Sequence, residues 1–287
     1  MTRGTILEGN GIMNWKTILV HLDNSRRCET RTRLAFDIAR RFDCHVVGLY
    51  LVCQDLAHHL FDLDEPLVRL AREETLRISR DNARAAFEHA AQLAGVIGEW
   101  RAPTGSLHDA ATLHGRHADV IVLGQDDADD PEAFIARHFV ENIVFASGRP
   151  VLLVPRAGDI GTLGENVAIA WDDSREAARA VADALPILRR ARFVEVMTVE
   201  RNRNEQAPAG IEIAAYLERQ GVRASFSSTP RLRGENTGMT LIDRANSVHA
   251  DVLVAGAYAH SRGLEQVLGG VTRTLLETST LPVLLSH

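Results

Sequence analysis

Cysteines are scarce in this chain of 287 residues, and the three that are present do not suggest disulfide bonds. Cys28, Cys44 and Cys53 all fall in the first third of the sequence and show no CxxC spacing. An odd number of cysteines without such spacing is typical of reduced thiols in a cytoplasmic protein. We therefore expect a cytoplasmic protein without a disulfide framework.

Long apolar runs are also missing. No stretch approaches the roughly 18 residues expected of a membrane-spanning helix, and the N-terminus has no apolar core of a secretory signal. Lys and Arg are scattered and the formal net charge is −6, so the basic patch that nucleic-acid binding requires is absent. We expect no membrane and no nucleic-acid partner. Residues 1–13 are expected to be a tail outside the fold, with Met13 as an alternative start.

The motifs of common hydrolases and phosphoryl-transfer proteins are absent as well. There is no GxSxG elbow, no Walker loop ending in Gly-Lys-Ser/Thr and no HExxH pair. Histidines 58, 59, 108, 114 and 117 lack the spacing of a zinc site, which needs about four convergent ligands. The sequence therefore gives no sign of an efficient enzyme or of a bound zinc ion.

What the sequence does contain is an internal repeat. The run Ala-Asp-Val-Ile-Val-Leu-Gly at 118–124 returns as Ala-Asp-Val-Leu-Val-Ala-Gly at 250–256. The run Pro-Val-Leu-Leu at 150–153 returns at 282–285 with the same offset. Both runs are apolar and strand-like, which indicates that the two copies share one fold.

A third match places an apolar run ending in Asp-x-Ser at 18–25 against 167–174. Three matches in the same order indicate a duplication, and the chain is long enough for two domains of ordinary size. A glycine-rich stretch separates the copies. We therefore expect one domain at 14–155, a linker at 156–165 and a second domain at 166–287.

Each copy is predicted to alternate strands and helices, because short apolar runs alternate with segments of helical periodicity. Runs such as 120–123 are apolar on both faces, as a parallel strand between two helix layers requires. The fold class is therefore α/β, with two tandem doubly wound (Rossmann-like) domains, each a five-stranded parallel sheet flanked by helices. The last strands, 151–154 and 283–285, are expected to pair the copies as a pseudo-twofold, because exposed edges this apolar would invite aggregation. In the first copy we expect strands at 16–22, 45–52, 97–102, 120–124 and 151–154, and helices at 31–42, 66–93, 108–116 and 133–145.

Residues 256–273, Gly-Ala-Tyr-Ala-His-Ser-Arg-Gly-Leu-Glu-Gln-Val-Leu-Gly-Gly-Val-Thr-Arg, carry the most specific pattern in the chain. Together with Trp-Lys-Thr-Ile-Leu-Val-His-Leu-Asp at 15–23 and the duplication, this pattern resembles the universal stress protein family in its tandem form. The resemblance implies an ATP-binding loop of Gly, two residues, Gly, nine residues, then Gly and Ser or Thr. It also implies that Asp172, after the first strand of the second copy, lies near the nucleoside.

The loop of the second copy matches this pattern in part. Gly256 and Gly269 have the family's spacing, whereas Ala259 replaces the middle glycine and Gly270 replaces the hydroxyl residue. Ligands of doubly wound sheets bind beyond the carboxyl ends of the strands at the switch point, where Asp172 and Gly256 should face one crevice. The residues after Gly269 precede a helical run whose N–H groups can hold phosphate oxygens.

Plainer interpretations stay open for single residues: Gly256 can serve helix packing alone, and Asp172 can be a helix cap with Ser174. Otherwise Asp172 would accept a ribose hydroxyl, while Thr272 and His260 would contact phosphate. The predicted cofactor is ATP or another adenine nucleotide, with or without Mg²⁺. The predicted site consists of Ala170, Trp171, Asp172, Met197, Ala255, Gly256, Ala259, His260, Gly269, Gly270, Val271 and Thr272.

The first copy has lost this loop, although Asp23 survives. Asp127, Arg137 and His138 stand where the second copy has its small loop residues. Residues 124–141 contain six acidic residues and one arginine, and like charges about 4 Å apart repel by ~1 kcal/mol even in water. We therefore expect no ATP in the first copy. The acidic loop is either a solvated connector or a patch for a divalent cation or a partner.

Three functions remain open from the sequence. The first is a non-catalytic ATP-binding stress-response protein that acts as a sensor or switch, and the family suggests that it forms a homodimer. The second is a scaffold that binds no nucleotide but holds an apolar ligand or a protein partner. The third is a weak ATPase, for which no residue is an evident base.

Overall fold

The computed structural model describes residues 14–52, 66–103, 107–130, 138–200, 211–230, 234–258 and 269–287. Strands and helices alternate along these ranges. The strands are β1 Thr17–Leu22, β2 His45–Tyr50, β3 Gly98–Arg101, β4 Val120–Gly124, β5 Val151–Val154, β6 Asn166–Ala170, β7 Phe193–Glu200, β8 Ser225–Pro230, β9 Val252–Gly256 and β10 Val283–Ser286. The helices are α1 Cys28–Phe42, α3 Pro66–Ala94, α4 Leu107–Gly115, α5 Phe139–Ala146, α6 Arg175–Leu188, α7 Ile211–Arg219, α8 Thr237–Ser247 and α9 Gly270–Thr278.

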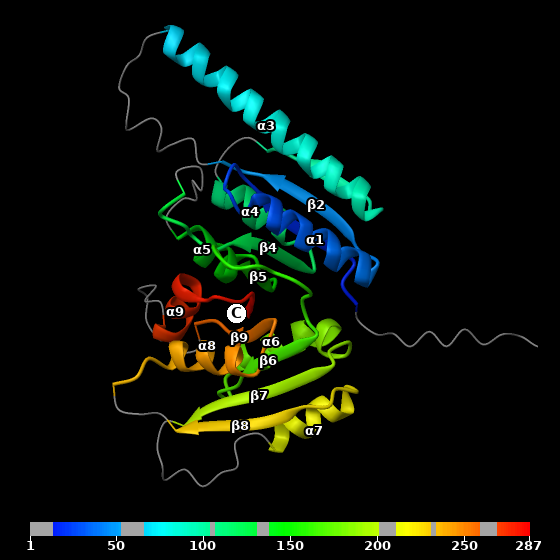
Figure 1. Ribbon diagram of the computed structural model, residues 1–287, viewed down its shortest axis with the longest axis vertical. Helices are drawn as coiled ribbons and strands as arrows, with labels where there is room; N and C mark the ends of the chain where they lie inside the picture. The colour runs from blue at the N-terminus through cyan, green and yellow to red at the C-terminus, as the bar shows by residue number, and fades with distance from the viewer. Residues whose placement is uncertain are drawn as a thin grey trace, which may run out of the picture.

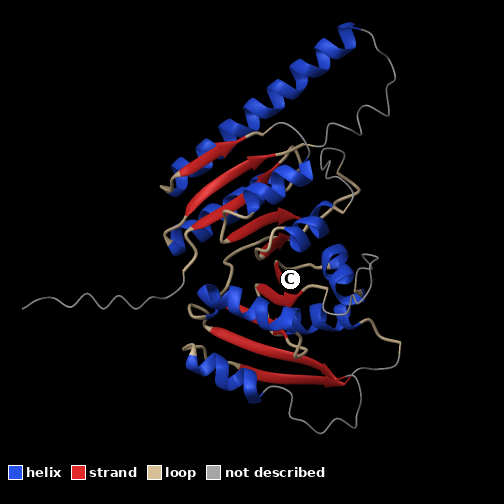
Figure 2. Cartoon of the chain, turned by 180° about the vertical axis from the view of Figure 1, so that it is seen from behind, coloured by secondary structure: helices blue, strands red, loops and turns tan. Residues whose placement is uncertain are grey.

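The described strands form a single ten-stranded sheet in the order β3-β2-β1-β4-β5-β10-β9-β6-β7-β8. Seen from behind, the strands follow one another down the length of the molecule (Figure 2). β1 to β5 are mutually parallel, as are β6 to β10, so each half has the doubly wound order predicted from the repeat. The α/β fold class is therefore confirmed.

The two halves join through their last strands. β5 pairs with β10 antiparallel, with Leu152 opposite Leu284, and both side chains are fully buried. The predicted pseudo-twofold pairing of the last strands is confirmed. Because the halves run in opposite directions, the carboxyl ends of β1 and β4 lie at one edge of the sheet and those of β6 and β9 at the other. The C-terminus lies between the halves (Figure 1).

Helices cover both faces of the sheet in two layers. One apolar cluster joins the buried side chains of α1, α3, α6 and α7 to one face, and a second joins those of α4, α5, α8 and α9 to the other. Each cluster runs through both halves, so burial of apolar area stabilises them as one unit. The helix α3 extends past the sheet at its N-terminal end (Figure 1).

Some element boundaries differ from those predicted. α1 begins at Cys28, three residues before the predicted start. α5 begins at Phe139, and the earlier part of the predicted helix, together with His58 and His59, falls outside the described residues. Among the described helices, none is both long enough and apolar enough to cross a membrane.

Candidate functional site

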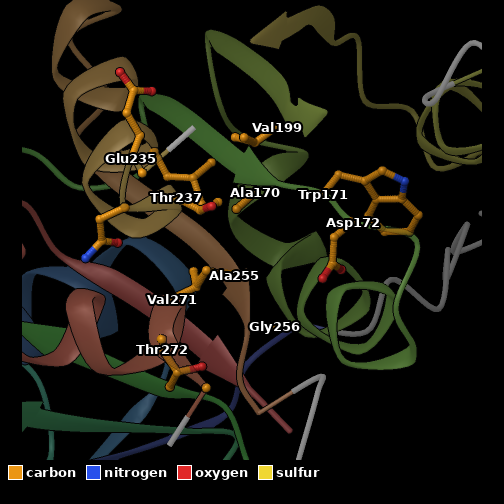
Figure 3. Close-up of a pocket in the computed structure, with 15 residues that line it drawn as sticks. Ala170, Trp171, Asp172, Val199, Glu235, Thr237, Ala255, Gly256, Val271 and Thr272 are labelled. Atoms are coloured by element: carbon orange, nitrogen blue, oxygen red, sulfur yellow. The ribbon is translucent and has the colours of Figure 1, made fainter. Parts of the chain in front are cut away.

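The candidate site lies at the switch point of the second half, where β6 runs between β9 and β7. Ala170 at the end of β6 is in register with Ala255 on β9, so the residues that follow both strands leave the sheet side by side. Asp172 and Gly256 therefore meet at one edge, as the sequence predicted, and the Asp172 carboxylate points toward the cavity there (Figure 3).

A cavity of about 500 Å³ opens at this edge. It has the size of a small-molecule site. Most of the predicted site residues line it, and they come from the ends of β6 and β9 and from the start of α9. These residues are Ala170, Trp171, Asp172, Ala255, Gly256, Gly269, Gly270, Val271 and Thr272.

One predicted residue is misplaced and two cannot be located. Met197 is 2% exposed in the core beneath the site and does not line the cavity, so that prediction was wrong. Val199, two residues closer to the carboxyl end of β7, takes its place because the strand runs on to Glu200. Ala259 and His260 lie outside the described residues.

The sequence prediction missed one wall of the cavity altogether. This wall is the connection from β8 into α8, which reaches the same edge because β8 belongs to the same parallel sheet. An Asn before a helical run is an N-cap signal that the sequence does carry, but nothing in it shows that this cap borders a cavity. The missed residues here are Gly234, Glu235, Asn236, Thr237 and Leu241.

Three helices begin at this edge, and they differ in how their first N–H groups are satisfied. Ser174 caps α6 by accepting the Ala177 N–H at 3.1 Å, and Asn236 caps α8 by accepting the Gly238 N–H at 2.9 Å. The N-cap residue of α9 is Gly269, which offers no side-chain cap. An uncapped helix start carries a partial positive charge and unpaired donors, which is an anion-binding arrangement.

Asp172 has both the structural and the ligand-facing character considered from the sequence. Its Oδ1 accepts the Ser174 N–H at 3.1 Å and the Ser174 hydroxyl at 2.5 Å, which orients the α6 cap. The residue is exposed, and Oδ2 makes no hydrogen bond to the rest of the described chain. One oxygen is therefore structural, and the other is available to a ligand hydroxyl.

The glycines of the site have two different roles. A Cβ on Gly256 would lie 2.5 Å from the Ala177 backbone nitrogen, so glycine is needed there for α6 to pack against β9. A Cβ on Gly269 or Gly270 would meet nothing within 4 Å, and Gly269 has φ −58°, so neither packing nor backbone conformation requires glycine at the helix start. Because neither residue has a side chain, nothing from Gly269 or Gly270 covers the backbone at the start of α9, which lines the cavity in the part of the chain that the structure describes.

The equivalent position of the first half is filled by an arginine. Asp23 makes the same turn with Ser25 as Asp172 does with Ser174, but it is only 4% exposed. The Arg31 guanidinium, fully buried beside it, donates to Asp23 Oδ1 at 2.8 Å and to the His21 carbonyl at 2.7 Å. A Cβ on Gly124 would collide with the same guanidinium. Arg31 therefore occupies the switch point that is open in the second half.

The charges of this cluster are set by burial and by the ion pair. Burial alone would raise the pKa of Asp23, but the adjacent Arg31 guanidinium brings that pKa below its usual value. Burial lowers the pKa of His21, whose Nε2 lies 3.0 Å from the Leu51 carbonyl. At neutral pH the cluster therefore holds a neutral imidazole and one buried ion pair.

The acidic loop of the first half is partly structural. Asp130 is 5% exposed and accepts the Arg26 N–H at 2.7 Å, next to the start of α1. The loop is therefore not only a solvated connector, which was one of the two interpretations of the sequence. In the described ranges, no three His, Cys, Asp or Glu side chains come together in a group that could hold a metal ion.

A second cavity of about 710 Å³ lies between α1 and α3 in the first half. Apolar side chains such as Phe36, Phe87 and Ala90 form its walls, and Arg33 and Asn82 are among its polar lining. The sequence analysis did not anticipate this groove, because it depends on how far α3 stands from α1.

Comparison with known proteins agrees with this architecture. The sequence profile of the Universal stress protein family matches residues 14–155. Among solved structures, the chain is similar to a universal stress protein from Archaeoglobus fulgidus, at 15% identity over 94% of this chain and 95% of that one, with a TM-score of 0.70. It is also similar to a functionally unknown protein from Pseudomonas aeruginosa, at 19% identity over 95% and 92% of the chains, with a TM-score of 0.57.

No curated protein matches the chain. At such low identities the structural similarity shows the fold alone, and it extends over both halves of the sheet. The profile match identifies the first half, residues 14–155, as a universal stress protein sequence. The chain belongs to the universal stress protein family.

Proposed function

We propose that the second half binds one adenine nucleotide per chain, ATP with or without Mg²⁺, and that the protein is a non-catalytic cytoplasmic sensor. The uncapped start of α9 beside the 500 Å³ cavity carries this proposal, because it offers backbone donors to phosphate oxygens. Asp172 Oδ2, on the opposite side of the cavity, suits a ribose hydroxyl. The buried Arg31–Asp23 pair supports a first half that binds no nucleotide.

Titration calorimetry of nucleotide-stripped protein with ATP tests the proposal. We expect one site per chain, and at least tenfold weaker binding, about 1.4 kcal/mol, in Gly269→Asp. The new carboxylate would cap α9 itself and repel phosphate, while a helix gains stability from Asp at this position. Loss of binding would therefore not arise from unfolding.

Gly161→Asp is the matched control, because it adds the same charge at an exposed glycine that has open space around it and does not line the cavity. It should bind ATP like the wild type.

Absence of binding at millimolar ATP would refute a nucleotide sensor. Two sites per chain would refute the prediction that the first half binds no nucleotide. Phosphate release that disappears in Asp172→Ala would instead indicate a weak ATPase. Sizing with and without ATP tests the expected homodimer.

The cavity between α1 and α3 favours a second candidate function, in which the first half binds an elongated anionic amphiphile such as a long-chain fatty acid. α3 lines the cavity from Ser79 to Ala94, which at 1.5 Å per helical residue is a groove of about 20 Å. Arg33 on its rim is exposed and has no ion pair within the described ranges, so it is free to meet a carboxylate.

Displacement of a fluorescent fatty-acid probe tests this second candidate. Ala90→Phe fills the groove and should weaken probe binding at least tenfold, because a bulky side chain takes the ligand's volume. Ala85→Phe places the same ring on the exposed side of α3, away from the cavity lining, and should leave binding unchanged. Equal probe binding by both variants would exclude the groove as the binding site.

A further inference from the structure

The last helix of the first half contacts the segment that follows β9 in the second half, two residues beyond the cavity residue Gly256. Phe145 in the final turn of α5 is 50% exposed, and its ring meets the Tyr258 ring edge-on, with centroids 6.1 Å apart. His287 stacks on Phe145 at 4.7 Å and also meets Tyr258 edge-on at 5.7 Å. Three rings from the two halves therefore form one cluster, and Tyr258 joins that cluster to the segment that follows Gly256 of the cavity lining.

Tyr258 has an unusual backbone conformation. Its φ is +66°, in the left-handed region that residues other than glycine and asparagine rarely adopt. The residue comes two positions after Gly256, where β9 ends at the cavity. A tyrosine keeps such a backbone only where its surroundings hold it, and the described surroundings of Tyr258 include the rings of Phe145 and His287.

This backbone sets the position of a cavity side chain. The Tyr258 N–H donates to the Thr272 hydroxyl oxygen at 3.1 Å, and Thr272 lines the cavity in the first turn of α9. Because the hydroxyl oxygen accepts from Tyr258, its proton is left to donate to another acceptor. A phosphate oxygen at the start of α9 is an acceptor of that kind.

The first half also holds the other end of α9. The Gln125 side chain, 5% exposed, donates to the Leu276 carbonyl in the last turns of α9 at 3.0 Å and accepts the Arg156 N–H at 2.9 Å. Gln125 follows the end of β4, in the position that Ala257 occupies after β9. Each half thus contacts the last helix or the site loop of the other half.

We propose that Phe145 of the first half is a positioning residue for the nucleotide site of the second half. Through ring contact it holds Tyr258 in its left-handed conformation, and the Tyr258 N–H in turn orients the Thr272 hydroxyl toward the ligand. The inference rests on the proposed nucleotide function. It gives the first half, whose own switch point Arg31 fills, a role in building the site of its neighbour.

The test compares Phe145→Ala with Leu113→Ala, which truncates an apolar residue of similar exposure, 56%, on α4. Phe145→Ala should weaken ATP binding about three- to tenfold, the range expected for one aromatic contact, while Leu113→Ala leaves it unchanged. In a Thr272→Val background, Phe145→Ala should have no further effect, because its action passes through that hydroxyl. Equal ATP affinity of the wild type and Phe145→Ala would overturn the inference and leave the nucleotide site standing.

If the wild type binds no ATP, hydrogen exchange of the nucleotide-free protein still tests the role of Phe145. The Tyr258 amide should exchange at least tenfold faster in Phe145→Ala than in the wild type or in Leu113→Ala, because its bond to Thr272 is no longer held. That result keeps Phe145 as a positioning residue for Tyr258 even if the proposed function fails. Unchanged exchange of this amide in Phe145→Ala would overturn the inference on its own.

Discussion

Replacing Arg31 with methionine is expected to lower the free energy of unfolding by about 3–5 kcal/mol, the cost of breaking a buried ion pair from one side. Arg31 is 1% exposed and Asp23 is 4% exposed, and the two are 2.8 Å apart. The variant would leave the Asp23 carboxylate buried without its counter-charge. Urea unfolding followed by circular dichroism measures the loss as a shift of the midpoint.

Two further variants separate the charge effect from simple loss of packing. Arg33→Met changes an exposed arginine two residues along α1, and its effect should stay within about 0.5 kcal/mol. The double variant Arg31→Met with Asp23→Asn removes the unpaired charge and should recover part of the lost stability. If Arg31→Met and Arg33→Met lower the free energy of unfolding by the same amount, the buried pair does not stabilise the first half as the distances suggest.

The same turn therefore has a different role in each of the two copies. The Asp-x-Ser turn after β1 and after β6 has the same hydrogen bonds in both halves. The offset of that match aligns Arg31 with Ala180. An arginine at that position closes the switch point and neutralises its Asp, whereas an alanine leaves the Asp exposed at a cavity. One side chain on the following helix accounts for much of the difference between the halves.

The fold was readable from the sequence because its determinants are local and repeated. Runs such as 118–124 show a buried parallel strand by their composition alone, and their recurrence at 250–256 fixed the duplication. The pairing of β5 with β10 followed from two apolar edges that need cover. The start of α1 was missed because Arg27, its N-cap residue, makes no side-chain cap.

The site was only partly readable, because much of it depends on contacts between distant segments. Met197 was predicted in place of Val199, which was not considered, because the length of β7 is not marked in the sequence. Nothing local shows that Arg31 turns inward, since an arginine on an amphipathic helix is usually solvated. The contact of Phe145 with Tyr258 joins residues from different halves, and it exists only because β5 and β10 bring those halves together.

Two of the glycines that line the second-half cavity, Gly256 and Gly269, should respond in opposite ways to the same added methyl group. Gly256→Ala is expected to lower the free energy of unfolding by about 1–3 kcal/mol, the usual cost of overpacking. The new Cβ would lie 2.5 Å from the Ala177 nitrogen and 2.6 Å from the Glu176 carbonyl carbon. Both are backbone atoms in the first turn of α6, so relief requires the helix to move.

Gly269→Ala adds its methyl group to open space at the start of α9, and its effect on unfolding should stay below about 1 kcal/mol, the difference between these residues as N-caps. It should instead weaken ATP binding, because the methyl group takes room at the uncapped N–H groups. Denaturant unfolding and calorimetric titration of both variants give the two quantities. Equal stability of both variants would mean that α6 yields easily, and undiminished ATP binding by Gly269→Ala would place the phosphates elsewhere than at α9.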